Sequence, residues 1–126
     1  LTAKTVGQVR EARERHPRLY EKIFDDIDAL VLQAVAALRD NDHRALGELM
    51  NICQGLLNAL QVSTPELERL IGIARAAGAL GAKLTGGGGG GAMVALCADA
   101  AGAGHVQQAI ERQGFRAMAV TIGATA

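Results

Sequence analysis

Apolar side chains recur at intervals of three and four residues through most of the first half of the chain. Over residues 19–38 they fall on one helix face, and Pro17 suits a first turn, so the pattern predicts a helix that continues to Arg39. At about 1.5 Å per residue this helix would be roughly 35 Å long. A weaker pattern over residues 6–13 predicts a short helix before it.

A third helix is predicted over residues 42–60, because Asp42 is a suitable N-cap and the apolar positions again share one face. The segment 63–66, Ser-Thr-Pro-Glu, offers two starts for the next helix. Its serine and glutamate fit a capping box, whereas its threonine would cap a helix with the proline at the first position, and the sequence leaves both open. This helix is predicted to end near Gly78, since glycine suits the left-handed residue that follows a helix.

A run of six glycines between two strand-like segments is the most informative feature for function. Keeping one glycine ordered costs about 0.5–1 kcal/mol more than keeping an alanine ordered, so the run costs roughly 3–6 kcal/mol. In return, backbone amides without Cβ neighbours can approach an anion closely. We interpret the run as a phosphate-binding loop, and a structural tight turn and a flexible linker are the alternatives. The flanking segments are Gly81–Thr85 and Ala92–Cys97, and the glycines are Gly86, Gly87, Gly88, Gly89, Gly90 and Gly91.

The surroundings of the glycines exclude two familiar phosphate motifs. A P-loop requires Gly-Lys followed by Ser or Thr and a helix, and a dinucleotide fingerprint also leads into a helix. Here Lys83 precedes the glycines and a strand-like segment follows them. Any phosphate would therefore be held by a loop that joins two strands.

The rest of the chain adds one helix and one strand to the predicted layout. A short helix around residues 106–110 ends before Gly114, and residues 115–122 alternate as in a last strand. Residues 1–78 are thus mainly helical, and residues 79–126 read as strand, glycine loop, strand, helix and strand. The prediction is a single α+β domain over residues 1–126, with helices packed on one face of a small antiparallel sheet.

Composition narrows the classes of partner. Acidic and basic residues number 13 each, so the chain has no overall field that would attract nucleic acid or an anionic membrane. One tyrosine, two phenylalanines and no tryptophan offer no stacking platform for single-stranded nucleic acid. No stretch reads as a membrane span or a signal peptide, and we expect a cytoplasmic protein.

The cysteines and histidines do not predict a catalytic or metal centre. Cys53 and Cys97 lie in apolar segments and read as buried free thiols, although the sequence leaves a disulfide between them open. His16, His43 and His105 stand far apart without ligands at metal-binding spacing, so no metal site is expected.

Three segments together resemble the C-terminal domain of mevalonate kinases, in the GHMP kinase superfamily: Leu46–Leu57, Ser63–Leu67, and Gly81–Thr85 leading into the glycines. The resemblance covers nearly the whole chain and implies a ferredoxin-like α+β domain. It also implies phosphorylation of mevalonate with ATP and Mg²⁺, a step of isoprenoid precursor synthesis. In that family the ATP-binding loop, the catalytic Asp and the Mg²⁺-binding Glu belong to an N-terminal domain. That domain is absent from this chain, so we assign no catalytic residue and expect no activity from the chain alone.

The resemblance also implies roles for a few positions. Thr85 and Gly86–Gly91 correspond to the family loop near the nucleotide phosphates. Thr2, Asn51 and Gln54 are predicted to lie on the substrate side. The implied partners are the N-terminal kinase domain and a small-molecule substrate, and apolar surface left bare without that domain would favour a homodimer.

Several readings of function remain open from the sequence. The chain departs from the family pattern at Gly87, where relatives usually have Ala, and at Ala92, where they usually have Cys. The phosphate acceptor could be that of another GHMP kinase, such as a phosphomevalonate, homoserine or sugar kinase. The same fold could also serve as a non-catalytic module that binds a phosphorylated metabolite, or as a structural domain whose glycine turn binds nothing.

Overall fold

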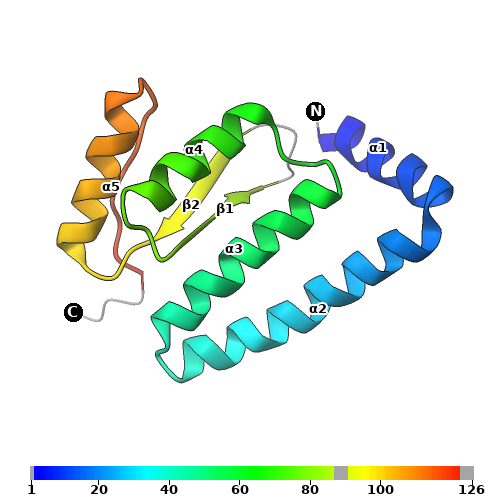
Figure 1. The fold of residues 1–126 in the computed structure, drawn as a ribbon, viewed down its shortest axis with the longest axis horizontal. Coiled ribbons are helices and arrows are strands. Elements are labelled where there is room, and N and C mark those ends of the chain that lie inside the picture. Colours follow the sequence, from blue (N-terminus) through cyan, green and yellow to red (C-terminus); the bar gives the residue numbers. More distant parts are fainter. Residues whose placement is uncertain (1, 87–90, 123–126) are drawn as a thin grey trace.

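The computed structural model describes residues 2–86 and 91–122 and forms an α+β fold. Within these residues, four helices precede a β-hairpin and a fifth helix follows it (Figure 1). The elements are α1 (Thr2–Arg15), α2 (Pro17–Arg39), α3 (His43–Ala59), α4 (Pro65–Ala76), β1 (Gly81–Thr85), β2 (Ala92–Leu96) and α5 (Ala100–Arg112).

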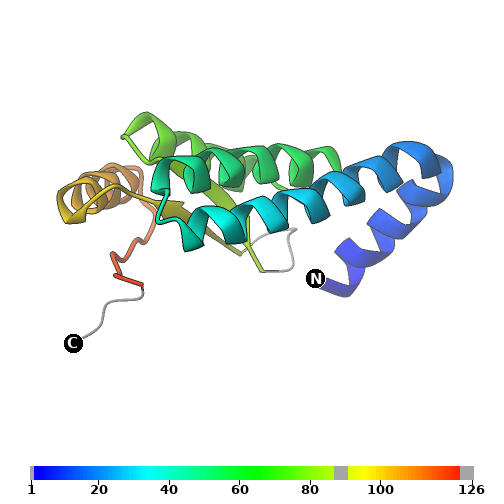
Figure 2. The same ribbon diagram turned by 90° about the horizontal axis from the view of Figure 1, so that it is seen from below.

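The long second helix forms as predicted. Pro17 occupies the start of α2, and the helix continues for 23 residues to Arg39. The chain then reverses through Asn41, which has a φ of 56°, and Asp42 caps α3 by accepting a hydrogen bond from the Ala45 amide at 3.1 Å. Helices α2 and α3 therefore lie side by side (Figures 1 and 2).

The start of α4 decides between the two caps that the sequence left open. The Thr64 side chain accepts a hydrogen bond from the Leu67 amide at 3.1 Å, and proline occupies the first position of the helix. The Ser63 hydroxyl is used elsewhere, as an acceptor for the Gln54 side chain at 3.0 Å. The helix ends at Ala76, and Gly78 has a φ of +106°, which confirms the predicted end.

The two strands pair antiparallel, with Gly81 opposite Leu96 and Thr85 opposite Ala92. Helix α4 contacts both strands, and α3 runs along β1 (Figure 1). Ala82 and Leu84 point into the helical layer and are 0% and 3% exposed. They belong to two core clusters, one beneath α1, α2 and α4 and the other between α4 and α5. The first cluster contains Ala12, Tyr20, Leu60, Val62, Leu67 and Leu84, and the second contains Ile71, Ala74, Ala82, Val106 and Ile110.

The predicted last strand over residues 115–122 is wrong. In the described part of the chain the sheet has only β1 and β2, and the segment after α5 pairs with neither. Phe115 packs on the second core cluster, and the Ala117 carbonyl accepts a hydrogen bond from the Gln107 side chain at 3.2 Å. Further along, Met118 and Ile122 are 82% and 88% exposed. Over residues 115–122 the backbone pairs with neither described strand, so the alternating pattern by itself does not form a strand.

Candidate functional site

The candidate site is the turn of the hairpin, where the glycine run begins and ends. Gly86 and Gly91 have φ angles of +89° and +94°, a region that side chains other than glycine rarely adopt. A Cβ built on either residue would meet no atom within 4 Å. Glycine is therefore required here by backbone conformation and not by crowding, and both loop ends are open to a ligand.

Part of the predicted loop lies outside the described residues, namely Gly87, Gly88, Gly89 and Gly90. Their phosphate contacts stay predictions. Of the remaining loop residues, Thr85 ends β1 and is exposed. Ala92, which stands where relatives usually have Cys, opens β2 opposite Thr85 and is exposed as well.

The hairpin is held very close to α3 at its base. A Cβ on Gly81 would lie 2.6 Å from the Gly47 Cα atom, and a Cβ on Gly47 would lie 2.6 Å from the Leu80 carbonyl carbon. Real Cβ atoms essentially never approach heavy atoms within 3.0 Å. The backbones of α3 and β1 can touch because both contact positions are glycine.

Asn51, one helical turn beyond Gly47, binds the edge of β1 that faces away from β2. Its side-chain oxygen accepts a hydrogen bond from the Ala82 amide at 3.0 Å, and its Nδ2 donates to the Leu80 carbonyl at 3.4 Å. A carboxamide carries the same donor and acceptor as a peptide group. Asn51 thus occupies the place that a neighbouring strand would take.

Gln54, three residues further on, continues the same row. Its Oε1 accepts from the Leu84 amide at 2.8 Å, in a bond that is fully buried. Its Nε2 donates to the Ser63 hydroxyl and to Glu68 Oε2, each at 3.0 Å. The side chain is only 5% exposed, so its burial is compensated by these three bonds.

These contacts bear on the residues predicted for the substrate side. The side-chain carboxamides of Asn51 and Gln54 both accept hydrogen bonds from the backbone of β1, so each residue has a structural role inside the fold. Thr2 begins α1, and Figures 1 and 2 place the start of α1 on the side of the molecule where β1 ends. A substrate contact of any of the three stays a prediction. The spacing of Gly47, Asn51 and Gln54, which places them on one helix face, is the sequence signal for this structural role, and the prediction did not use it.

The comparison with family models matches residues 34–116 to the family described as "GHMP kinases C terminal". This match covers more than half of the chain, including α3, α4, the hairpin and α5. The chain belongs to the GHMP kinase family.

Curated relatives of this GHMP kinase domain are named mevalonate kinase. The Methanothermobacter thermautotrophicus protein is 44% identical over 96 residues, which cover 76% of this chain and 32% of that protein. The Pyrococcus abyssi protein is 48% identical over 100 residues, which cover 75% of this chain and 30% of that protein. The chain therefore spans about a third of the length of the curated relatives it matches.

Solved structures agree with the fold of the GHMP kinase domain. The L. major mevalonate kinase in complex with R-mevalonate superposes with a TM-score of 0.87 at 35% identity. That match covers 90% of this chain and 35% of the other. The mevalonate kinase of methicillin-resistant Staphylococcus aureus gives a TM-score of 0.65 at 36% identity, over 75% of this chain and 32% of the other.

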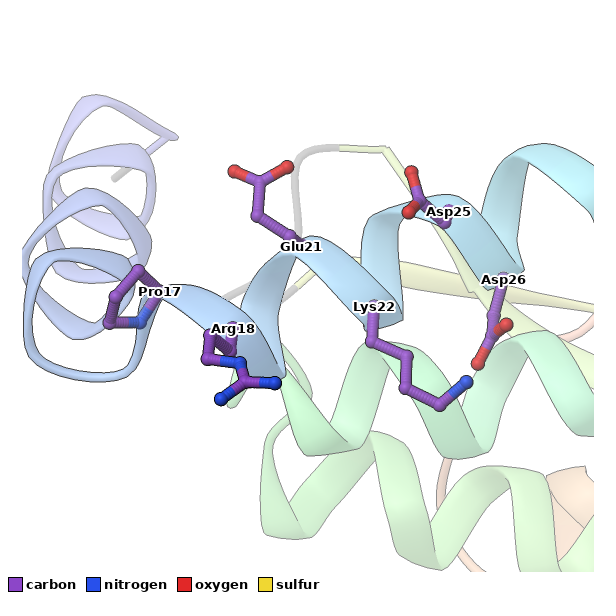
Figure 3. Close-up of a pocket in the computed structure, with 6 residues that line it drawn as sticks. All are labelled: Pro17, Arg18, Glu21, Lys22, Asp25 and Asp26. Carbon is purple, nitrogen blue, oxygen red and sulfur yellow. The ribbon is translucent and has the colours of Figure 1, made fainter.

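A surface pocket lies on α2. It is lined by side chains of mixed charge that all come from one stretch of this helix (Figure 3). Figure 3 shows them spread along the outside of the helix, with Lys22 and Asp26 leaning toward each other. Because one helix supplies the whole lining, the pocket is an ordinary solvated face. The residues are Pro17, Arg18, Glu21, Lys22, Asp25 and Asp26.

Over residues 2–86 and 91–122, no three His, Cys, Asp or Glu side chains come together as a metal cluster. Both cysteines are free, Cys53 buried and Cys97 half-buried. Desolvation by burial, and secondarily the charge of Asp99, raises the pKa of the Cys97 thiol. A raised pKa makes this thiol less reactive, which is the opposite of a catalytic cysteine. In the same part of the chain no helix combines the length and apolar character needed to cross a bilayer.

Proposed function

We propose that this chain is the C-terminal part of an ATP-dependent kinase that phosphorylates mevalonate. The observation that supports this most is the 44–48% identity to proteins named mevalonate kinase, over a stretch that contains the glycine hairpin and the α3 residues that hold it. We propose further that the hairpin binds the nucleotide phosphates. Support for this comes from the exposed loop ends and from the positive φ angles of Gly86 and Gly91.

The chain's own part in such a reaction is to position the phosphates. ATP supplies the phosphoryl group, and Mg²⁺ neutralises its charge. Backbone N–H groups at the open ends of the glycine loop would donate to phosphate oxygens, and no Cβ stands in their way. As the family resemblance implies, we assign metal binding and proton abstraction to a partner domain.

A chimera tests the proposal directly. The matched C-terminal part of the Methanothermobacter thermautotrophicus kinase is replaced by this chain, and release of ADP is measured with ATP, Mg²⁺ and mevalonate. We expect turnover by the chimera and none by the 126-residue chain alone. Turnover by the chain alone would contradict the assignment of the catalytic groups to another domain.

The same chimera is also assayed with phosphomevalonate, homoserine or galactose in place of mevalonate. About two thirds of the chimera comes from the Methanothermobacter thermautotrophicus protein, so the decisive result is whether this chain supports turnover at all. A folded chimera that binds ATP and transfers no phosphate to mevalonate would instead favour a non-catalytic module that binds a phosphorylated metabolite.

A further inference from the structure

Matched contact positions on helix α3 and strand β1 are separated by nearly the same distance along each element. Gly47 and Gln54 are seven residues apart, which is about 10.5 Å along a helix. Their contacts on the strand, Gly81 and Leu84, are three residues apart, which is about 10 Å along a strand. Asn51 falls between them and reaches Ala82. The spacing of Gly47, Asn51 and Gln54 along α3 therefore matches the spacing of their contacts along β1.

This row completes the hydrogen bonding of an edge that would otherwise be unpaired. The amides of Ala82 and Leu84 and the carbonyl of Leu80 all bond to carboxamides of α3. An unpaired strand edge is a liability for a folded protein, and a buried one must have its backbone groups satisfied. Because the partners are two side chains on a rigid helix, they determine the register of β1 along α3.

We propose that Asn51 and Gln54 are positioning residues for the two described ends of the glycine loop, Gly86 and Gly91. Leu84, which Gln54 holds by its amide, stands two residues before Gly86 and its positive φ. Gln54 also donates hydrogen bonds to Ser63 and Glu68 at the start of α4. One buried side chain of α3 therefore links β1 to α4 as well as to α3. The inference rests on the proposed function only for the identity of the ligand that the loop binds.

The first experiment measures amide hydrogen exchange and ¹⁵N–¹H resonances in the 126-residue chain. The variants are Asn51→Ala and Gln54→Met, with Asn58→Ala as the control on the same helix because Asn58 is exposed. We expect exchange at Ala82 in the first variant and at Leu84 in the second to become about tenfold faster, since each amide loses its acceptor. The resonances of the adjoining loop end should move, while the amides of α2 and α5 stay unchanged.

Rescue separates positioning from general destabilisation. Asn51→Asp keeps an acceptor for the Ala82 amide, but it loses the longer bond to the Leu80 carbonyl and sets a second acceptor oxygen against that carbonyl. Exchange at Ala82 should therefore fall between that of the unsubstituted chain and that of Asn51→Ala. Equal acceleration across all helices in both variants, or loop resonances that stay in place, would overturn the proposal.

The second experiment titrates inorganic triphosphate and follows the amides of Gly86 and Gly91. In the unsubstituted chain we expect these resonances to shift, and in Gln54→Met we expect the dissociation constant to rise about tenfold, with no rise in Asn58→Ala. Equal affinity in Gln54→Met would overturn the positioning role. If triphosphate leaves the amides of the unsubstituted chain unmoved, phosphate binding by this loop fails, and the exchange pattern alone decides the positioning role.

Discussion

Replacing Gly81 by alanine tests the close contact between α3 and β1. The new Cβ would lie 2.6 Å from the Gly47 Cα atom, whereas ordinary contact begins near 3.4 Å. The two backbones would have to separate by at least about 0.8 Å, because the new Cβ would come closer still to the Gly47 carbonyl oxygen. The three bonds that Asn51 and Gln54 make to β1 now measure 2.8, 3.0 and 3.4 Å, so the same separation would stretch or break them.

The expected loss combines two effects. Forcing extra volume into a close backbone contact costs about 1–3 kcal/mol. Weakening the three bonds costs about 0.5–1.5 kcal/mol for each bond that is lost. Removing a glycine from the unfolded chain returns about 0.4–1 kcal/mol. We therefore expect Gly81→Ala to lower the free energy of unfolding by about 2–4 kcal/mol, a large part of the stability of a domain this size.

Urea unfolding followed by far-UV circular dichroism measures this loss, and Gly55→Ala is the matched control. Gly55 lies inside α3, and a Cβ there would meet nothing within 4 Å. That substitution should raise the free energy of unfolding by about 0.5–1 kcal/mol, because alanine favours a helix. If Gly81→Ala costs less than about 1 kcal/mol, or behaves like Gly55→Ala, the close contact between α3 and β1 does not constrain the fold.

Three further predictions concern local features. Thr64→Ala should cost about 1 kcal/mol in urea unfolding because α4 loses its N-cap, and a neutral result would contradict the assignment of the cap to Thr64. Gly78→Ala should cost about 1 kcal/mol in the same assay, since its φ of +106° strains any side chain even though the space around it is open; a gain in stability would refute this. Cys97 should react with iodoacetamide more slowly than free cysteine at pH 8, because its raised pKa leaves less thiolate, and mass spectrometry would reveal a faster reaction that contradicts this. The pKa of the Cys97 thiol is higher in the folded chain than in the unfolded chain. Any stability that the protonated thiol contributes is therefore fully present below the pKa of the unfolded chain, and it is lost as the pH rises through the pKa of the folded chain.

The local elements could be predicted from the sequence because their signals are local. Proline at the start of α2, Asp42 before α3 and Gly78 after α4 each act on a backbone within a few residues, so they need no tertiary partner. The glycine run was likewise predicted to join two antiparallel strands, and the pairing of β1 with β2 confirms this. The resemblance to the family rested on the glycine run and on segments of α3 and of the start of α4.

What only the tertiary structure decided concerns groups brought together from distant parts of the chain. The alternation after Gly114 resembled a strand, but a strand needs a neighbour, and no edge in the described structure receives it. Asn51 and Gln54 were predicted to lie on the substrate side, and only the approach of β1, thirty residues later, shows their side-chain amides bonded to its backbone. Sequence spacing determines which side chains share a helix face, whereas the element that meets this face depends on the packing of the whole chain.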